Sequence, residues 1–414
     1  MQKIETYDVI VVGGGASGMM AAGKAGAMGK RVLLIEKNKT LGQKLRITGG
    51  GRCNVTNATY DTRTFLQNYG TAGAFLPSPF SQFGVKDTFT FFENLGLPLV
   101  VQARNRAFPK TEKAVDVLNA LLKYMKQGKV SIMSGTPVKK IIHKDGKVEG
   151  VVAGGVTYKA KSYILATGGV SHPETGSTGD GFDWLRGLGH IVKTPTPSIV
   201  PIEVSDTWVH KLSGRALANM KITFYLEGKK QLSLVGRILF THFGLSGPLI
   251  LNNASKVGDW LQSGTVTATI DAFPELDIGA LDHKLTEIFD QNKNKILKNI
   301  LKDIAPDGTA PGISMLLSEL DMETKVHSIT KAQRRKIVDT LKALPIQVTN
   351  LMGYDKAVVA DGGVVLKEID TKTMRSKLFA NLFITGDLLD INRPSGGYSL
   401  QICWTSGFVA GMNA

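Results

Sequence analysis

A glycine-rich segment near the start of the chain holds the first residues whose types and spacing suggest chemistry. Gly13, Gly15 and Gly18 have the GxGxxG spacing and follow the apolar, β-branched run 7–12 (YDVIVV). An Ala-rich segment, expected to be helical, comes next, and the following apolar run ends in Glu36. Such glycines let the backbone approach a pyrophosphate at a helix N-terminus, while the acidic residue accepts from ribose hydroxyls. This combination predicts a dinucleotide site but does not distinguish NAD from FAD.

Three later segments also place glycine beside polar side chains. Residues 48–57 (TGGGRCNVTN) contain three successive glycines, then an arginine and an asparagine that could line a pyrophosphate and a ring edge. The ATGG at 166–169 ends an expected buried strand, where doubly wound folds place ligand-contacting turns. The TGD at 385–387 ends another, and the GGYSLQ at 396–401 could present a helix N-terminus to a reduced flavin. Together these segments favour a flavin dinucleotide.

The composition is that of a globular protein with more than one domain. The chain has 414 residues, and domains average roughly 150 residues, which predicts two or three of them. Glycine accounts for 46 residues without low complexity, which suits several ligand-contacting turns. The two cysteines, Cys53 and Cys403, form no CxxC and no cysteine–histidine cluster. We therefore expect no metal site, and a reducing compartment is favoured.

Net charge and apolar runs bear on partners and location. Fifty Lys and Arg against 35 Asp and Glu give a formal net charge of +15, which favours anionic partners such as nucleotide phosphates, nucleic acid or acidic surfaces. No signal peptide precedes the first strand-like run, and no uninterrupted apolar run reaches the roughly 18 residues of a membrane span. These features predict a soluble cytoplasmic protein that is not bound to a membrane.

The rest of the chain divides into segments of different periodicity. A proline-rich stretch that includes Pro195 (TPTPSIVPIEV) is expected to be a domain boundary. Beyond it, β-like runs between 220 and 270 give way to a helical period at 281–344, in which Thr330 is expected to cap the last helix. Strand-like segments return after residue 346. A last buried strand and an apolar, helix-like segment close the chain.

Six motifs together resemble those of a known family. They are GGGASG, TGGGRCNVTN, ATGG, SHPETGSTGDG (171–181), FTHFGLSGP (240–248) and ITGDLLDIN followed by GGYSLQ. Over nearly its whole length the chain resembles the bacterial FAD-dependent oxidoreductases that include aminoacetone oxidase and the bile-acid 3-dehydro-Δ4,6-reductase. The resemblance implies an α/β fold, with a Rossmann-like FAD-binding domain in two chain segments, interrupted by a β-barrel-like domain that carries a helical insertion.

The resemblance and the changes in periodicity together suggest domain boundaries. The FAD-binding domain would occupy 1–195 and return at 371–414 to close the chain. Between these segments, 196–275 would form the barrel-like substrate domain, 276–345 the helical insertion and 346–370 the return strands of the barrel-like domain. The substrate would then lie between the flavin and the barrel-like domain.

The resemblance also implies which residues bind FAD. Contacts to the ADP half are expected from Gly13, Gly15, Ser17, Gly18, Glu36 and Lys37. Contacts to the pyrophosphate, the ribityl chain and the flavin ring are expected from Lys44, Gly50, Arg52, Asn54, Gly386, Asp387, Gly396, Gly397, Tyr398 and Ser399. Further cofactor contacts are expected from Val138, Thr167 and Gly168.

The chain departs from the family's pattern within this set. Members commonly have Glu where this chain has Asp387 and Asn where it has Ser399, and the loop between the two positions contains Arg393 followed by proline. Aspartate is a shorter version of the same acceptor, so FAD binding is expected to be retained. Arg393 and Ser399 are expected near the reacting face of the flavin, so the substrate of a characterised member does not transfer directly to this chain.

Four residues are candidates for catalysis, namely His172, His242, Tyr398 and Arg393. The two histidines lie in Gly- and Ser-rich loops that the resemblance places on the cofactor side of the barrel. Either could be a general acid or base near neutral pH, or could simply bond to loop backbone. Tyr398 could touch flavin or substrate, or only pack. Cys53 could be a reactive thiol, but without a second nearby cysteine it is better interpreted as a small buried filler.

These features predict an FAD-dependent oxidoreductase that moves a hydride or electron pair between non-covalently bound FAD and a small organic substrate, by amine oxidation or by C=C reduction. A second strand–GxGxxG–helix unit is not found, so NAD(P)H would be a transient electron donor only. The alternative is an RNA-binding or tRNA-modifying flavoprotein that uses the lysine-bearing helices at 293–302 and 331–342. Because few aromatics interleave with these lysines, a solvated face is favoured over nucleic-acid binding. The sequence leaves the oligomeric state open.

Overall fold

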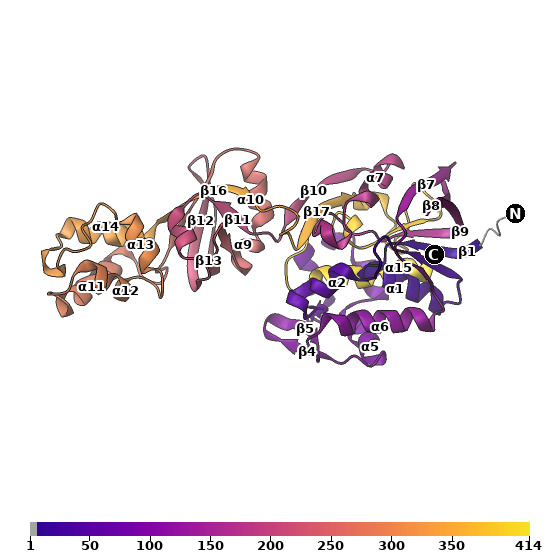
Figure 1. The fold of residues 1–414 in the computed structure, drawn as a ribbon, viewed down its shortest axis with the longest axis horizontal. Coiled ribbons are helices and arrows are strands. Elements are labelled where there is room, and N and C mark those ends of the chain that lie inside the picture. The colour runs from indigo at the N-terminus through magenta and orange to yellow at the C-terminus, as the bar shows by residue number, and fades with distance from the viewer. Residues whose placement is uncertain (1–5) are drawn as a thin grey trace. The chain divides into compact units, whose positions relative to one another are not determined.

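The computed structural model describes residues 6–414, which fold into two compact units (Figure 1). Unit 1 comprises residues 6–196 and 358–414, and unit 2 comprises 197–357. Unit 1 is a Rossmann-like α/β domain made from two chain segments, and unit 2 contains a closed β-barrel with a helical insertion. The fold class expected from the sequence is confirmed.

A seven-stranded sheet forms the centre of unit 1. Its strands lie in the order β6-β2-β1-β9-β8-β7, and β18 pairs in parallel with the end of β9. The strands are β1 (Thr6–Val12), β2 (Val32–Ile35), β6 (Ser131–Met133), β7 (Val138–Lys144), β8 (Lys147–Ala153), β9 (Val156–Leu165) and β18 (Leu382–Ile384). Because β1 and β9 are parallel and pair Val12 with Leu165, the turns that follow them emerge at the same edge of the sheet. Doubly wound folds bind ligands at this carboxyl edge.

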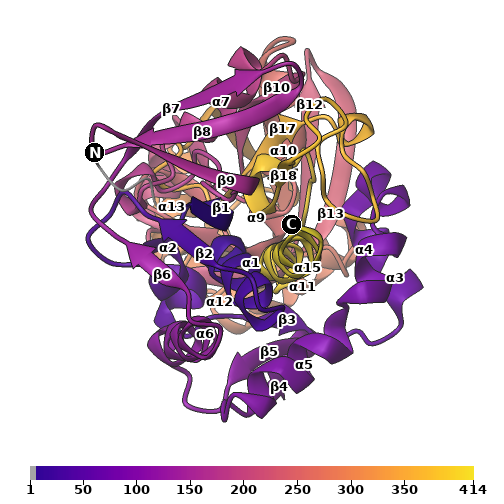
Figure 2. The same cartoon turned by 90° about the vertical axis from the view of Figure 1, so that its right-hand side faces the viewer.

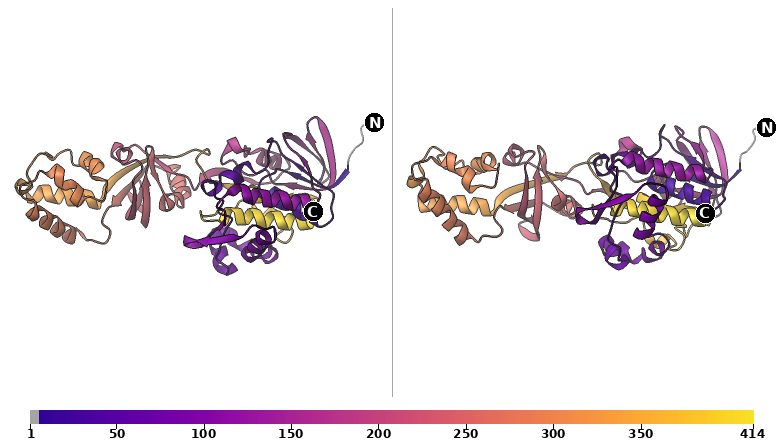
Figure 3. Two further views of the ribbon diagram at one scale, coloured as in Figure 1. Left: turned by 60° about the horizontal axis from the view of Figure 1, so that its bottom comes forward. Right: turned by 90° about the horizontal axis from the view of Figure 1, so that it is seen from below.

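Helices α1 (Ala16–Ala27) and α15 (Tyr398–Asn413) lie side by side in unit 1 (Figure 2), and the yellow α15 is seen lengthwise in Figure 3. Their approach requires small residues. A Cβ added at Gly407 would lie 2.4 Å from the carbonyl oxygen of Ser17, and one at Gly411 would lie 2.3 Å from that of Ala21. The other helices of unit 1 are α2 (Gln43–Ile47), α3 (Thr62–Leu66), α4 (Pro77–Gln82), α5 (Val85–Asn94), α6 (Ala114–Gln127) and α7 (Asp180–Gly187).

Two smaller sheets complete unit 1. One contains β3 (Thr56–Asn57), β4 (Leu99–Gln102) and β5 (Arg106–Pro109), and the other pairs β10 (Val192–Ser198) with β17 (Val359–Val364). The N-terminal strand–helix–strand unit lies where the sequence predicts it. The buried strand expected just before the ATGG at 166–169 is the end of the longer β9, whose first residues pair with β8.

Unit 2 is built on a closed barrel with the strand order β11-β14-β13-β12-β15-β16. Its strands are β11 (Ile202–Val204), β12 (Ala216–Leu226), β13 (Lys229–Phe240), β14 (Gly244–Ser246), β15 (Val266–Asp271) and β16 (Leu344–Leu351), and its first helices are α8 (Thr207–Lys211), α9 (Pro248–Leu251) and α10 (Ala254–Leu261). Between β15 and β16 the chain inserts α11 (Ile278–Gln291), α12 (Leu297–Ile304), α13 (Ala310–Leu316) and α14 (Lys331–Lys342) at one end of the barrel (Figure 1). One apolar core spans the barrel and these helices.

The start of α14 shows how the sequence encodes a helix boundary. Thr330 is its N-cap, as predicted. The Thr330 hydroxyl accepts from the backbone N–H of Gln333 at 3.2 Å, and the Gln333 side chain accepts from the backbone N–H of Thr330 at 2.8 Å. This capping box satisfies two N–H groups that the helix itself cannot bond.

The chain returns to unit 1 earlier than the sequence suggests. The expected return strands of the barrel, 346–370, contribute only β16, because β17 pairs with β10 and unit 1 resumes at residue 358. Gly362 makes this pairing possible, since its φ is +108° and an added Cβ would lie 2.9 Å from the Cα of Pro195. A close contact between two backbones does not produce a pattern of hydrophobic residues, so the sequence could not predict that β17 pairs with β10.

Across residues 6–414, no helix combines the length and the apolar character needed to cross a membrane.

The contact between α1 and α15 can be tested with Gly407→Ala. The added methyl group would overlap the Ser17 carbonyl, so we expect the free energy of unfolding to fall by about 1–3 kcal/mol. Urea unfolding of the FAD-free protein, followed by circular dichroism, measures this change. The control is Gly187→Ala at the end of α7, where an added Cβ would meet no atom within 4 Å. Equal stability of the two variants would contradict the tight packing.

Candidate functional site

A cavity lies at the carboxyl edge of the sheet in unit 1. It holds about 1130 Å³ of empty space, part of which is open to solvent. Its walls come from the turns after β1, β2 and β9 and from α2, β7, α7 and the start of α15. Of the residues predicted from the sequence, the cavity is lined by Gly13, Gly15, Ser17, Glu36, Lys37, Lys44, Val138, Thr167, Gly168, Asp387 and Ser399.

The glycine turn after β1 forms one wall of the cavity. A Cβ at Gly13, whose φ is +107°, would lie 2.4 Å from the carbonyl oxygen of Ala166, and one at Gly18 would lie 1.9 Å from that of Gly13. Gly15, the N-cap of α1, instead has open space at its Cβ position. The first N–H groups of a helix have no partner within it, so an anionic group can approach the backbone at Gly15.

Glu36 forms a second, adjacent wall. Its buried carboxylate accepts from the backbone N–H of Gly14 through Oε2 and from that of Asn38 through Oε1, each at 2.7 Å. An ionised carboxylate offers about four acceptor positions, so capacity for ribose hydroxyls remains. The neighbouring Lys37 forms an ion pair of 2.8 Å with Asp180 at the start of α7. These groups suit the ADP half of a dinucleotide.

Two charged side chains, Lys44 on α2 and Asp387 in the last segment of the chain, lie close together in the cavity wall. The Lys44 ammonium donates to the Ser171 hydroxyl at 3.1 Å and lies 4.0 Å from Oδ2 of Asp387. Burial lowers the pKa of Lys44, and the nearby Asp387 carboxylate opposes that change. The wall therefore holds a cation and an anion side by side, in a setting where burial strengthens their electrostatic effect on a ligand.

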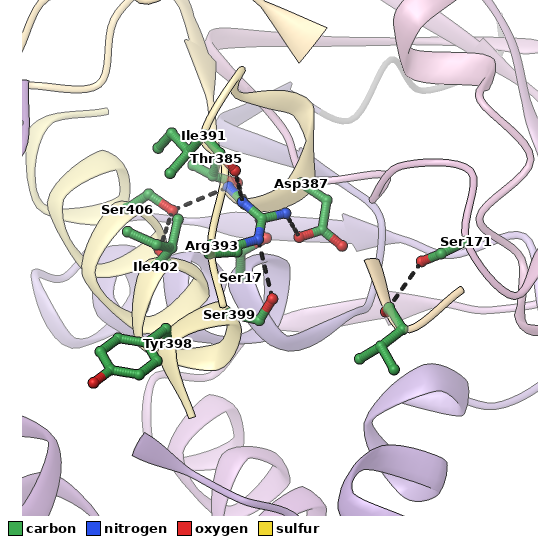
Figure 4. Close-up of polar contacts among 12 residues, drawn as sticks. Ser17, Ser171, Thr385, Asp387, Ile391, Arg393, Tyr398, Ser399, Ile402 and Ser406 are labelled. Atoms are coloured by element: carbon green, nitrogen blue, oxygen red, sulfur yellow. Dashed lines mark hydrogen bonds and ion pairs between the residues drawn. The ribbon is translucent and has the colours of Figure 1, made fainter. Parts of the chain in front are cut away.

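Arg393 lies behind this wall, and Figure 4 shows its guanidinium between Asp387 and Ser399. Its side chain is only 1% exposed. Nη2 donates to Oδ1 of Asp387 at 2.5 Å, Nε donates to the Ser399 hydroxyl at 3.0 Å, and Nη1 donates to the Ile391 carbonyl at 3.1 Å. Asp387 and Ser399 line the cavity but Arg393 does not, so in this structure Arg393 would not contact a ligand in the cavity.

Other residues predicted to bind the cofactor do not line this cavity; they are Gly18, Gly50, Arg52, Asn54, Gly386, Gly396, Gly397 and Tyr398. Arg52 is partly exposed, with its guanidinium 4.5 Å from the centre of the Phe108 ring and 3.6 Å from Glu112. Gly386 donates its N–H to the Ser406 hydroxyl. The side-chain oxygen of Asn54 is buried and has no hydrogen-bond partner among residues 6–414.

The double-glycine turn before α15 is explained by packing. A Cβ at Gly397 would lie 2.3 Å from the carbonyl carbon of Thr56, and Asn57 donates through its side-chain amide to the Gly396 carbonyl at 3.2 Å. The glycines thus let α15 begin directly against β3. The Tyr398 ring packs 4.9 Å from that of Phe65, and burial raises the pKa of Tyr398. In Figure 4 the Tyr398 ring points away from Arg393 and Ser399.

The two candidate histidines belong to different units. His172 lies in the loop that contributes Thr175, Gly176 and Ser177 to the cavity wall, and its Nδ1 is 2.8 Å from Oε1 of Glu174. His242 is exposed on unit 2, where its ring meets that of Phe243 edge-on at 4.9 Å.

Both cysteines are buried in unit 1, and burial raises the pKa of each thiol to about 12. Cys53 is fully enclosed, as its interpretation as a filler requires, and a thiol with such a pKa is a poor nucleophile at neutral pH. Cys403, by contrast, lines the cavity.

Several lining residues were not predicted individually. They include Asn38, Trp184 and Cys403, together with Thr175, Gly176 and Ser177. The segment 171–181 signalled the last three because it belongs to the motifs that carry the resemblance. Trp184 follows on α7, and only the packing of that helix brings it to the cavity.

The family of the chain follows from its sequence profile. The family described as HI0933-like protein Rossmann domain matches residues 7–413. The chain belongs to the HI0933-like family. The expected resemblance to FAD-dependent oxidoreductases is confirmed, and this protein is an enzyme of that class.

Two curated relatives align with almost the whole of this chain. The 3-dehydro-bile acid delta(4,6)-reductase of Clostridium scindens is 28% identical over 408 residues, covering 98% of each chain. The ribosomal RNA dihydrouridine synthase of Escherichia coli is 27% identical over 405 residues, covering 98% of this chain and 97% of its own. Among solved structures, the 3-ketosteroid-Δ4-(5α)-dehydrogenase of Rhodococcus jostii has a TM-score of 0.52 at 14% identity and covers 100% of this chain and 98% of its own, which shows a shared fold.

The residues that line the cavity of this protein fit FAD. Backbone at Gly15 is open to a phosphate, and Glu36 retains acceptor capacity for a ribose. The Thr167 hydroxyl is buried at the wall and has no hydrogen-bond partner among residues 6–414, although buried hydroxyls are rarely left unsatisfied. A polar group of the cofactor can satisfy it.

The contribution of Glu36 to FAD binding is testable with Glu36→Gln. The amide keeps the shape but faces one backbone N–H with its own NH₂ group, and it loses the negative charge. Hydrogen bonds to charged groups contribute about 1.5–3 kcal/mol, so we expect the Kd for FAD to rise about 10–100-fold, measured by quenching of flavin fluorescence. Glu149→Gln, at an exposed carboxylate on β8 of the same sheet, is the control. An unchanged Kd would exclude Glu36 as a ribose acceptor.

Proposed function

We propose that this protein is an FAD-dependent reductase that adds hydrogen across a carbon–carbon double bond conjugated to a carbonyl group. The observation that carries the proposal is the pair of full-length relatives, whose names describe the same bond chemistry on different substrates. A 3-dehydro-Δ4,6 steroid and a uracil ring both have a C=C bond adjacent to a C=O group. We therefore assign the bond type, and we leave the scaffold around it to experiment.

The reaction needs a hydride, a proton and a source of electrons. When bound and reduced, FAD supplies a hydride to the carbon β to the carbonyl, and an acid supplies the proton that the α carbon takes up. NAD(P)H is the proposed donor that returns two electrons and a proton as a hydride. The chain then has three tasks, which are to hold FAD, to orient the conjugated substrate and to deliver the proton.

The residues of the cavity walls would perform the first task, which is to hold FAD. The backbone at Gly15 and the N-terminus of α1 would hold the pyrophosphate, and Glu36 would accept from the ribose. Lys44, Asp387 and Ser399 would contact the part of FAD that lies toward the start of α15. Electrostatic contacts in a partly enclosed cavity would bind a dianionic cofactor without a covalent link.

His172 is the proposed proton donor. Its Nδ1 is held by the Glu174 carboxylate at 2.8 Å, which fixes the plane of the ring. The His172 side chain is 26% exposed and does not itself line the cavity, so a substrate would meet it beside the cavity wall. Loop residues on both sides of His172 reach the cavity region, since Ser171 bonds Lys44 and Thr175 lines the wall. A histidine oriented by a carboxylate suits proton transfer near neutral pH.

RNA binding through the helical insertion is not favoured by the charge of the insertion as a whole, although the helices at 293–302 and 331–342 together contain nine Lys and Arg and one Asp. Residues 276–345 contain eleven Lys and Arg and ten Asp and Glu. Several of the basic side chains are also paired within unit 2, as in the ion pairs Arg334–Asp282, Lys298–Glu323 and Lys336–Glu319. Binding to phosphates depends on an excess of positive charge, which this segment lacks.

The proposed reaction is testable by following the flavin spectrum without oxygen. Protein saturated with FAD is reduced by NADH or NADPH and then mixed with a 4,6-dien-3-one steroid, with uridine or with the saturated 3-ketone. We expect at least one of the two conjugated compounds, the dienone steroid or uridine, and not the saturated ketone, to restore the oxidised spectrum. The compound that does so should gain 2 mass units, because only a conjugated C=C bond accepts the hydride.

Two other outcomes would overturn the proposal. If the oxidised flavin is bleached by aminoacetone and recovers rapidly in air, while no conjugated alkene reoxidises the reduced form, the protein is an amine oxidase. If no flavin absorbance appears on adding FAD, the cavity does not serve this cofactor.

The role of His172 is testable with His172→Gln. We expect the rate of flavin reoxidation by the alkene to fall about 10²–10⁴-fold, because reoxidation needs the proton that His172 donates. Flavin reduction by NAD(P)H does not need this proton and should stay unchanged. Stopped-flow absorbance resolves the two steps. His283→Gln is the matched control, since that exposed histidine also lies near a glutamate, Glu287, but on α11 of the insertion. Equal loss in both half-reactions would indicate a structural role instead.

A further inference from the structure

Three polar residues near the C-terminal end of unit 1 form one connected network. Asp387, Arg393 and Ser399 are separate in the sequence, yet the Arg393 guanidinium bonds the other two side chains directly (Figure 4). Nη2 reaches Asp387 and Nε reaches Ser399, while Nη1 is held by the Ile391 carbonyl. A planar guanidinium can direct bonds to several acceptors at fixed angles, which a lysine ammonium cannot reproduce.

The network places charge against the cavity. Arg393 is almost completely buried, and a buried cation is costly unless it is paired. Asp387 supplies the pairing carboxylate, and its other oxygen lies 4.0 Å from the Lys44 ammonium. The three groups carry two positive charges and one negative charge. The cluster of Arg393, Lys44 and Asp387 at this wall is therefore positive by one charge.

Ser399 adds a directed hydroxyl to this positive wall. Its oxygen accepts from Nε of Arg393, and a hydroxyl has one proton of its own to donate. Ser399 lines the cavity in the first turn of α15, where the helix dipole also favours negative charge. Arg393, Lys44, Ser399 and the helix N-terminus thus act in the same electrostatic direction.

We propose that Arg393 is a positioning residue that fixes Asp387 and Ser399 at the cavity wall and makes the cavity favour the reduced, more negative form of FAD. The inference rests on FAD binding in this cavity and holds whichever substrate is reduced. Arg393 supplies charge from behind the wall and does not touch the cofactor itself. A buried cation beside the cavity acts on a ligand whose charge changes during the reaction, because burial weakens the screening by water.

The test uses four variants, three of which change the charges beside the cavity wall and one of which is a control. Arg393→Met removes one positive charge and leaves Asp387 and Lys44 balanced. Asp387→Asn removes the negative charge. The double variant Asp387→Asn/Arg393→Met restores the net charge of the wild type without the ion pair. Arg186→Met, at an exposed arginine on α7, removes a charge from the surface of the same unit and is the control.

The measurement is the flavin reduction potential of each purified, FAD-loaded protein, taken without oxygen against a reference dye, together with the Kd for oxidised FAD. We expect Arg393→Met to reduce the preference for reduced over oxidised FAD about tenfold, which is about 30 mV for a two-electron couple. Asp387→Asn is expected to raise the potential, and the double variant to return it close to the wild-type value. Arg186→Met is expected to leave it unchanged.

The outcomes separate this inference from the proposed function. Wild-type protein that binds no FAD would overturn both. FAD binding with the same potential in the wild type and Arg393→Met would overturn only the inference. If Arg393→Met does not fold, the reduction potentials of Asp387→Asn and of the double variant still test whether the charge at this wall sets the potential. A double variant whose potential stays far from the wild-type value would show that charge at this wall does not set the potential.

Discussion

The close packing of α1 against the ends of β1 and β9 is the constraint on which the rest of the site depends. No Cβ fits at Gly18, because the Gly13 carbonyl would lie 1.9 Å away, and none fits at Gly13, because the Ala166 carbonyl would lie 2.4 Å away. These contacts hold the first turn of α1 at the carboxyl edge of the sheet. The parallel pairing of Val12 with Leu165 then brings the turn at Thr167 to the same edge. The turns after β1 and β9 therefore form adjoining walls of the cavity, and the turn after β2 together with α2, β7, α7 and the start of α15 supplies the rest.

The last segment of the chain completes the cavity from the other side of α1. Helix α15 approaches α1 through Gly407 and Gly411, and its start is held against β3 at Gly397. This fixes the first turn of α15, and with it Ser399, at the cavity wall. The turn after β18 contributes Asp387 in the same way. Residues near both ends of the sequence must therefore fold together before either can bind a cofactor, and the barrel and its helices form an insertion between them.

Local patterns in the sequence predicted much of this structure. The apolar runs at β1 and β2, the glycine spacing and Glu36 are encoded within a few residues of one another, so their arrangement could be inferred from spacing alone. The path of β17 could not, because Gly362 is placed by close contact with Pro195, a residue far away in the sequence. The position of Arg393 behind the wall was missed for the same reason. Sequence indicated a charged group near the cofactor, and only the fold shows that Asp387 and Ser399 separate it from the cavity.

The distribution of charge explains what the basic composition means. Residues 1–196 and 358–414 contain 31 Lys and Arg and 18 Asp and Glu, whereas residues 197–357 contain 19 and 17. Nearly all of the excess positive charge thus belongs to the segments that form the cavity-bearing unit. A dianionic dinucleotide is attracted by such a field, and the field acts over the surface as well as within the cavity. The buried pair formed by Arg393 and Asp387 works differently, because it is shielded from salt and directed at one wall. The net charge of the chain therefore bears on how a nucleotide cofactor is attracted, while the few buried charges determine how the protein treats it once it is bound.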